Sequence, residues 1–291
     1  MGKSNLEMNY YRLLLLLLLG SITQLASAQN KVLLKISMDP GKTYKTHMNT
    51  IMDMEMTVKG DSAIIKQLSA SGMQLPILMH MDQHFGTTTK TGQQRADKKT
   101  PLTMTFDQMS MTQSVSGQES AQNENPFANA VIEGTTIGDG KISIDTIKGE
   151  LDDALKISMR QMVNNLQQSI KFPAEELKIG DSFDMEVPMN LPIPQAEMKM
   201  MLVTKYILKE IKDHKAIFDL KQNITMDMSI TQNDSKGNGA GTGTGTMIYD
   251  INKKIAEQSD SNIQFQFEFG VSGLTMSATC NGKTNVKCTV E

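Results

Sequence analysis

Methionine is the residue type most suggestive of chemistry in this chain. It occurs 24 times in 291 residues, and pairs of the form Met-x-Met recur at 52/54/56, 79/81 and 226/228. On an extended strand this spacing places thioether sulfurs side by side, an array suited to Cu(I). The same alternation also describes an adaptable apolar lining that accepts variable hydrophobic ligands. Because the pairs recur in many segments, whereas a metal site needs one cluster, the pattern favours the apolar lining.

Histidine and aspartate form a second candidate site, at His80, Asp82 and His84. Alternate residues of a strand share a face about 6.6 Å apart, so two adjacent members of this trio have the spacing to chelate one metal ion. His80 and His84 would be roughly 13 Å apart, too far for both to bind it. The pattern therefore favours a polar outer face opposite Met79 and Met81, with a metal site as the alternative.

The two cysteines, Cys280 and Cys288, flank Asn281-Gly282-Lys283. In an oxidising compartment this predicts a disulfide that closes a small loop, because a redox or metal-binding pair would use C-x-x-C spacing. No serine lies in a G-x-S-x-G motif, the arrangement that exposes a hydrolase nucleophile. We therefore predict a protein that is not an enzyme and uses no cofactor.

The first 28 residues predict export. Lys3 and Arg12 precede the leucine run Leu13–Leu19, and a small-residue cleavage site ends at Ala28, the pattern of a secretory signal peptide. No later segment approaches the roughly 20 apolar residues that span a bilayer. We expect a mature chain without a transmembrane segment, in the periplasm or, alternatively, outside the cell.

The net charge of the chain limits the kinds of partner that it is expected to bind. The signal takes away Lys3, Arg12 and Glu7, so 27 basic residues face 31 acidic ones in the remainder. A mildly acidic chain without a basic cluster is not expected to bind nucleic acid. The expected partners are a lipid or other apolar ligand, or a protein of the cell envelope.

The segments that carry these residues alternate as strands do. Apolar and polar residues alternate strictly from Tyr44 to Lys59, which predicts a strand with one buried side. At about 3.3 Å per residue it would run roughly 50 Å, which implies strong bending in a curved sheet or open barrel. Further strands are predicted at 73–81 and at 102–111, with a bulge after Phe106. Hairpins are predicted over 198–230 and 242–269, and a last pair of strands around Asn281-Gly282. The polar stretches 114–125 and 231–240 are expected to be loops.

One segment has a helical period instead. Apolar residues at 151, 155, 159, 162, 166 and 170 form a stripe, and Pro173 ends the helix. The predicted fold is therefore mainly β: a curved antiparallel sheet or half barrel with one principal helix, 151–171, on its concave face. After the signal peptide, residues 29–291 form a single domain, with two related halves of about 29–147 and 173–291 joined by the helix.

These elements point to a ligand groove between helix and sheet. The leading hypothesis is a non-catalytic exported protein that binds a hydrophobic ligand or partner there. The residues assigned to the groove are Met52, Met54, Met56, Met159, Met162, Met226 and Met228. The alternatives are soft-metal binding through the Met-x-Met pairs and a structural role in the envelope.

Several motifs together resemble a known family. They are the export signal, Gly41-Lys42-Thr43-Tyr44, the methionine-alternating strands, the segment PAEELKIGDSF (173–183) and the glycine-rich strand that ends at Asp250. This combination, which covers nearly the whole mature chain, resembles an uncharacterised family of exported β-proteins from Bacteroidetes-type bacteria. Members often have Trp where this chain has Phe183. The predicted architecture is also similar to the half barrels of periplasmic lipoprotein carriers, but no functional residues carry over from either resemblance.

Overall fold

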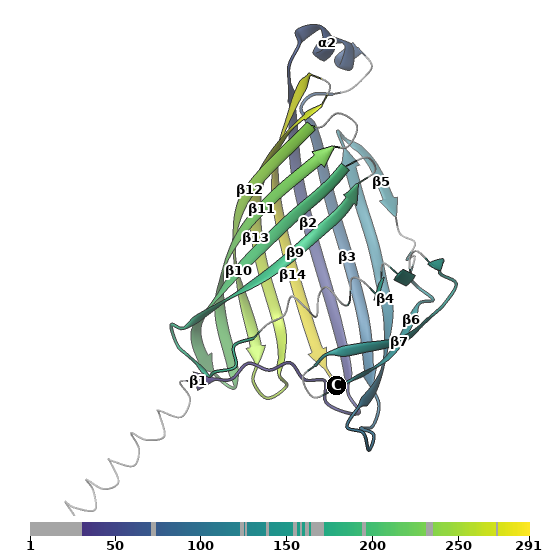
Figure 1. Ribbon diagram of the computed structural model, residues 1–291, viewed down its shortest axis with the longest axis vertical. Coiled ribbons are helices and arrows are strands. Elements are labelled where there is room, and N and C mark those ends of the chain that lie inside the picture. Colours follow the sequence, from purple (N-terminus) through teal and green to yellow (C-terminus); the bar gives the residue numbers. More distant parts are fainter. Residues whose placement is uncertain are drawn as a thin grey trace, which may run out of the picture.

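A computed structural model describes residues 31–291 except 71–73, 123–124, 126, 138–139, 154–155, 158, 161–162, 164–171, 194–195, 231–234 and 272. Within these residues the protein is mainly β-sheet (Figure 1). The predicted signal peptide and its cleavage site at Ala28 lie outside the described residues.

One antiparallel sheet of twelve strands dominates the protein. Its order is β7-β6-β4-β3-β2-β14-β13-β12-β11-β10-β9, and β5 pairs with β4 beside this path. The long strands are β2 (Thr43–Lys59), β3 (Ile77–Thr91), β4 (Thr100–Val115), β10 (Ala196–Lys212), β11 (Lys215–Ile230), β12 (Ser235–Asp250), β13 (Ile255–Val271) and β14 (Leu274–Val290). The shorter ones are β5 (Gln118–Gln122), β6 (Val131–Thr136), β7 (Ile142–Lys148) and β9 (Ser182–Ile193). A separate two-stranded sheet pairs β1 (Lys31–Val32) with β8 (Leu177–Lys178).

The large sheet is strongly curved but does not close into a barrel, because β7 and β9 remain as its two edges (Figure 1). At the β9 edge, Pro188 and Pro192 have no N–H to offer another strand. Prolines at an edge prevent further pairing, so they favour an open sheet. The predicted fold class, a curved antiparallel sheet that stays open, is confirmed.

The centre of the sheet is a seam between the first and last long strands. β2 and β14 pair in unbroken register from Tyr44 opposite Val290 to Lys59 opposite Thr275. Beyond the seam, Thr43 and Glu291 exchange two backbone hydrogen bonds of 3.0 and 2.9 Å. On either side of the seam, strands that neighbour one another in the sheet follow one another closely along the chain. The relationship of the two halves by duplication remains a prediction.

Two local predictions are confirmed by the register. Gly86 pairs with Gln108 while Thr87 pairs with Phe106, so Asp107 is the extra residue of a bulge that follows Phe106. The 198–230 hairpin is also present, and its turn residues Asp213 and His214 have φ of 49° and 59°. Two consecutive positive φ values give the turn a twist that matches the flanking strands.

The predicted turn at Asn281-Gly282 is wrong, because β14 continues through both residues. Gly282 faces the side chain of Ile263, and a Cβ at this position would lie 2.9 Å from Ile263 Cγ1. The glycine therefore serves close packing between strands rather than a change of direction. The predicted loops at 114–125 and 231–240 are also partly wrong, since they contain β5 and the start of β12.

Two helical segments accompany the sheet. Helix α2 (Ser62–Ala70), which was not predicted, is capped by Asp61 Oδ1, which accepts a 2.7 Å hydrogen bond from the backbone N–H of Ala63. In the predicted helix 151–171, the described residues 153, 156–157, 159–160 and 163 have helical backbone. Met159 and Val163 are buried against Phe106, Ala130, Ile132 and Ile147, on the concave side of β4, β6 and β7.

Another hydrophobic cluster covers the concave side of the sheet at the end opposite α2 (Figure 1). There Val32, Leu34 and Leu177, from the small sheet and its flank, pack on Leu208, Phe218, Tyr249 and their neighbours in β10–β12. The hydroxyl of Tyr249 accepts a hydrogen bond from Lys35 N (3.1 Å) and donates one to Lys35 O (2.5 Å). This end of the concave side is therefore covered by the chain itself.

Candidate functional site

The candidate site is a group of apolar side chains on the concave side of the sheet. Alternate residues of each strand point to this side, and the registers align them in rows across the strands. We call the group the concave methionine face. Its members are Met52, Met54, Met56, Met79, Met81, Met200, Met226 and Met228, together with Phe265 and Phe267.

Contacts within this face run from strand to strand across the sheet. Met226 on β11 and Phe265 on β13 belong to one buried cluster, against which Met54 on β2 and Met200 on β10 also pack. Four strands separate β2 from β10 in the sheet order. The link passes through the strands between them, because Met54 lies opposite Cys280 and Cys280 lies opposite Phe265. The predicted groove residues Met54 and Met226 therefore belong to one continuous apolar surface.

The face is buried on one flank and partly exposed on the other. The side chains of Met226 and Met228 are only 4% and 8% exposed. Those of β2 and β3 are half-buried: Met52, Met54, Met56, Met79 and Met81. Sulfur-bearing apolar surface is thus left within reach of another molecule along β2 and β3.

A strip of glycines on β12 forms the floor between the two flanks. A Cβ at Gly239 would lie 2.7 Å from Phe267 Cβ, and one at Gly241 would lie 2.2 Å from Phe265 Cβ. The rings of Phe265, Phe267 and Phe269 stack in line with centroids 6.2 and 6.0 Å apart. The neighbouring strand β13 and its phenylalanines take the space that these glycines leave.

Of the two helical residues of the predicted groove, one lies in another cluster and the other lies outside the described residues. Met159 is 2% exposed and belongs to the separate cluster around Phe106 and Ile132. Met162 lies outside the described residues. The candidate site is therefore built on strands.

Two residues of the site were missed from the sequence. Gln222 on β11 and Thr204 on β10 are buried, pair directly in register and interrupt the apolar concave rows of their strands. The signal was present in the alternation, where Gln222 separates Leu220 from Ile224 and Thr204 separates Leu202 from Tyr206. Each looks unremarkable alone, and only the register places them side by side.

The histidine cluster lies on the convex side. His80 Nδ1 is 2.7 Å from Asp53 Oδ1, and His84 Nδ1 is 2.8 Å from Asn49 Oδ1. Asp82 Oδ1 is 3.3 Å from His84 Nε2, so each histidine has its own partner. Among the described residues, no group of three or more His, Cys, Asp or Glu side chains is placed to hold a metal ion.

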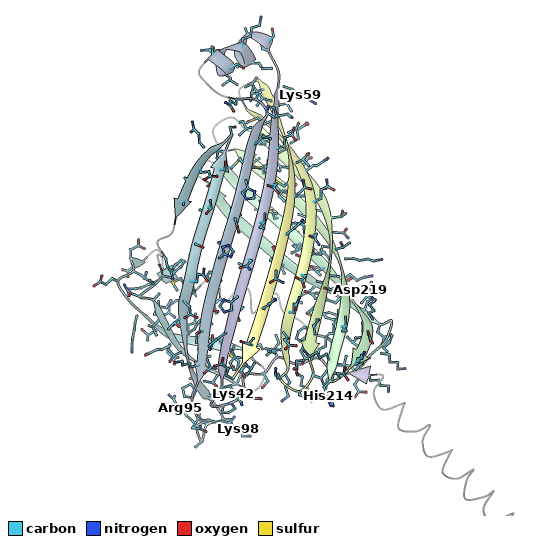
Figure 2. The ribbon with its side chains drawn as sticks, turned by 180° about the vertical axis from the view of Figure 1, so that it is seen from behind. Lys42, Lys59, Arg95, Lys98, His214 and Asp219 are labelled. Carbon is cyan, nitrogen blue, oxygen red and sulfur yellow. The ribbon has the colours of Figure 1, made fainter. Side chains whose placement is uncertain are left out.

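The convex side is polar along its length. Figure 2, which views it with side chains drawn, has Lys59 at the end that carries α2 and Lys42, Arg95 and His214 at the opposite end. Apolar residues are sparse there. The most exposed of them near the histidines is Leu78, whose exposed fraction is 53%. The apolar and polar sides of the sheet are thus separated.

The predicted disulfide is wrong. Cys280 and Cys288 are both free and lie on the same extended strand, opposite Met54 and Thr46 respectively. Eight residues of strand separate them by roughly 26 Å, whereas a disulfide requires Cα atoms less than about 7 Å apart. Burial raises the pKa of the Cys280 thiol to about 11 and also raises the pKa of Cys288, so both thiols are protonated at neutral pH.

The other pKa shifts also favour the protonation state that each group already has at neutral pH. Burial raises the pKa of the Tyr206 and Tyr249 hydroxyls. A hydrogen bond from Lys215 to Glu257 raises the pKa of that lysine. None of these shifts moves a group toward a pKa near 7, the range that general acid–base chemistry uses.

Comparisons with known proteins give no family. No family model and no curated protein matches the chain. Among solved structures, it is similar to OccK7 (OpdD) from Pseudomonas aeruginosa, with a TM-score of 0.32 and 6% identity over 85% of this chain and 100% of that one. It is also similar to an outer membrane channel from Pseudomonas putida F1, with a TM-score of 0.30 and 9% identity over 88% of this chain and 98% of that one. Similarity this low identifies neither a shared fold nor a shared activity.

In the described part of the chain, no helix has both the length and the apolar character that a membrane span requires.

Proposed function

We propose that this is a non-catalytic exported protein that binds an apolar ligand on the concave methionine face. One observation carries the proposal: the methionines of β2 and β3 face the inside of the curved sheet yet stay half-buried. At the opposite end of the same side, β1 and β8 cover the sheet with residues of the chain itself.

The chemistry of the lining supports a ligand of variable shape. Methionine is unbranched and flexible, so it adapts to irregular apolar surfaces. Phe265 and Phe267 add flat rings above the glycine floor, and burial of apolar ligand surface against such a lining is favourable by about 25 cal/mol per Å². A long-chain lipid fits this combination of a bent, apolar and elongated face.

The test compares matched substitutions on the two sides of the sheet. Met54→Gln lies on the concave methionine face, and Leu78→Gln lies on the convex side of the neighbouring strand. Native mass spectrometry of the purified protein, with titration of a long-chain fluorescent fatty acid, measures binding. We expect bound lipid in the wild type, binding at least fivefold weaker in the Met54 variant and no change in the Leu78 variant. Absence of binding in the wild type would refute the proposal.

A second candidate function, Cu(I) binding, is favoured by one feature of the register. Met54 stands directly between Met79 on β3 and Cys280 on β14, so two thioethers and a thiol share a row on the concave side. Soft sulfur ligands of this kind select Cu(I). Met54→Ile separates the candidates, because it removes the sulfur and keeps an apolar side chain. Loss of copper with lipid binding intact would support the metal site, whereas a wild type that takes up no copper under reducing conditions would exclude it.

A further inference from the structure

A buried hydrogen-bond acceptor on the concave side has no partner. The Gln222 side chain is 8% exposed, and its Oε1 is buried without a hydrogen bond. Its Nε2 contacts Thr204 Oγ1 at 3.5 Å, the outer limit of a hydrogen bond. A buried acceptor that lacks a partner is costly, so its persistence calls for a reason.

The unpaired oxygen lies over the glycine floor. A Cβ added to Gly243 would lie 2.6 Å from Gln222 Oε1, so this oxygen occupies the concave side of β12, where Gly243 has no side chain. In the same row, Ile263 on β13 packs over Gly243 and over Gly282 on β14, and Met52 on β2 follows. The acceptor therefore lies beside Ile263, in a row that leads to the methionine face.

Packing alone does not account for this pair of polar residues. The neighbouring concave positions are apolar on both strands: Leu220 and Ile224 flank Gln222, and Leu202 and Tyr206 flank Thr204. A methionine or leucine in place of Gln222 would continue the apolar row and would remove the unpaired Oε1. The pair instead provides one polar point in an otherwise apolar lining, the arrangement by which ligand sites fix orientation.

We propose that the ligand is an apolar molecule with a hydroxyl or N–H group, and that Gln222 Oε1 accepts the hydrogen bond from that group. This inference rests on the proposed function and adds the class of ligand. With its donor at Gln222, the apolar part of the ligand extends across the sheet toward Met52 and the other half-buried methionines of β2 and β3. Four steps between neighbouring strands correspond to about 19 Å, a length suited to a long alkyl chain.

The test uses two probes, dodecan-1-ol and its methyl ether, in which a methyl group replaces the hydroxyl hydrogen and so removes the donor. Both are titrated against the full-length purified protein by displacement of a bound fluorescent fatty acid. A neutral hydrogen bond that also satisfies a buried acceptor corresponds to about a tenfold difference in affinity. We expect the wild type to bind the alcohol about tenfold more tightly than the ether. In Gln222→Met, which conserves volume and removes the acceptor, the difference should fall below about twofold.

A matched control and the wild type keep the inference falsifiable. Gln264→Met changes the same residue type at an exposed position on the convex side of β13 and should keep the tenfold preference. Equal binding of alcohol and ether by the wild type would overturn the inference and leave the proposed function standing, even if Gln222→Met fails to fold. A preference that persists in a folded Gln222→Met would also overturn it. Binding of neither probe, together with no binding of the fatty acid, would overturn the proposed function as well.

Discussion

Replacing Gly241 with alanine is expected to destabilise the protein strongly. The added Cβ would lie 2.2 Å from Phe265 Cβ, 2.5 Å from Gln264 O and 2.6 Å from Phe265 Cα. Carbon atoms in contact normally lie about 3.5–4.0 Å apart, and the atoms here belong to or adjoin the β13 backbone, so no side-chain rotation relieves the overlap. Strand β13 must shift, and overpacking of this kind costs about 1–3 kcal/mol. We place Gly241→Ala at the upper end, about 3 kcal/mol.

Gly270→Ala is the matched control for this prediction. It also replaces a strand glycine with alanine, yet the nearest atom to its added Cβ is Leu274 O at 3.8 Å. Here alanine should be neutral or stabilising by about 0.4–1 kcal/mol, because it restricts the unfolded chain. Thermal unfolding followed by far-UV circular dichroism measures both variants. The Gly241 variant should melt about 5–10 °C lower than the wild type. Equal stability of the two variants would refute the proposed role of the glycine floor.

Three further predictions concern stability and thiol chemistry. Because burial raises the folded-state pKa of Cys280 to about 11 from an ordinary value of 9.0, stability from the protonated thiol is complete below about pH 9. It is lost as the pH rises toward 11, so Cys280→Ala should flatten the fall in urea midpoint across that range, and an unchanged slope would contradict the assignment. Intact mass analysis after iodoacetamide in denaturant should find two alkylated cysteines without prior reduction, whereas an unmodified pair would revive the disulfide. Tyr249→Phe should cost about 1–3 kcal/mol, because it leaves both backbone groups of Lys35 without their partner. Amide exchange in residues 31–36 should then rise, and unchanged exchange would mean that this segment is held by other contacts.

Alternation along a strand is the property that the sequence reveals most reliably. The run from Tyr44 to Lys59 alternates so strictly that strand, buried face and curvature all follow from it, and the phase slip after Phe106 locates the bulge. These features depend on neighbouring residues only. The methionine face was predictable for the same reason, because it is the buried side of several such strands.

Features that depend on the adjacent strand were not predictable in the same way. Asn281-Gly282 is a strong turn signal by itself, but in the fold Gly282 makes room for Ile263 on β13. Residues 235–240 lack apolar alternation because their concave positions, Gly237 and Gly239, are covered by phenylalanines of β13. The pairing of Gln222 with Thr204 likewise requires the register. In each of these three cases, a residue on the adjacent strand fills the space or provides the partner, and the sequence of one strand does not reveal it.

The seam between β2 and β14 has a consequence for how the molecule is made. The partner of the earliest long strand is the latest one to be synthesised, and more than 200 residues lie between Tyr44 and Val290, which pair across it. Each half can form its own consecutive pairings early, but the two cannot be joined until the final strand arrives. Ordering so distant a pairing is slow. Until then both halves present a long unpaired edge at what will become the middle of the sheet, so the nascent protein depends on being kept from neighbouring chains for most of its synthesis.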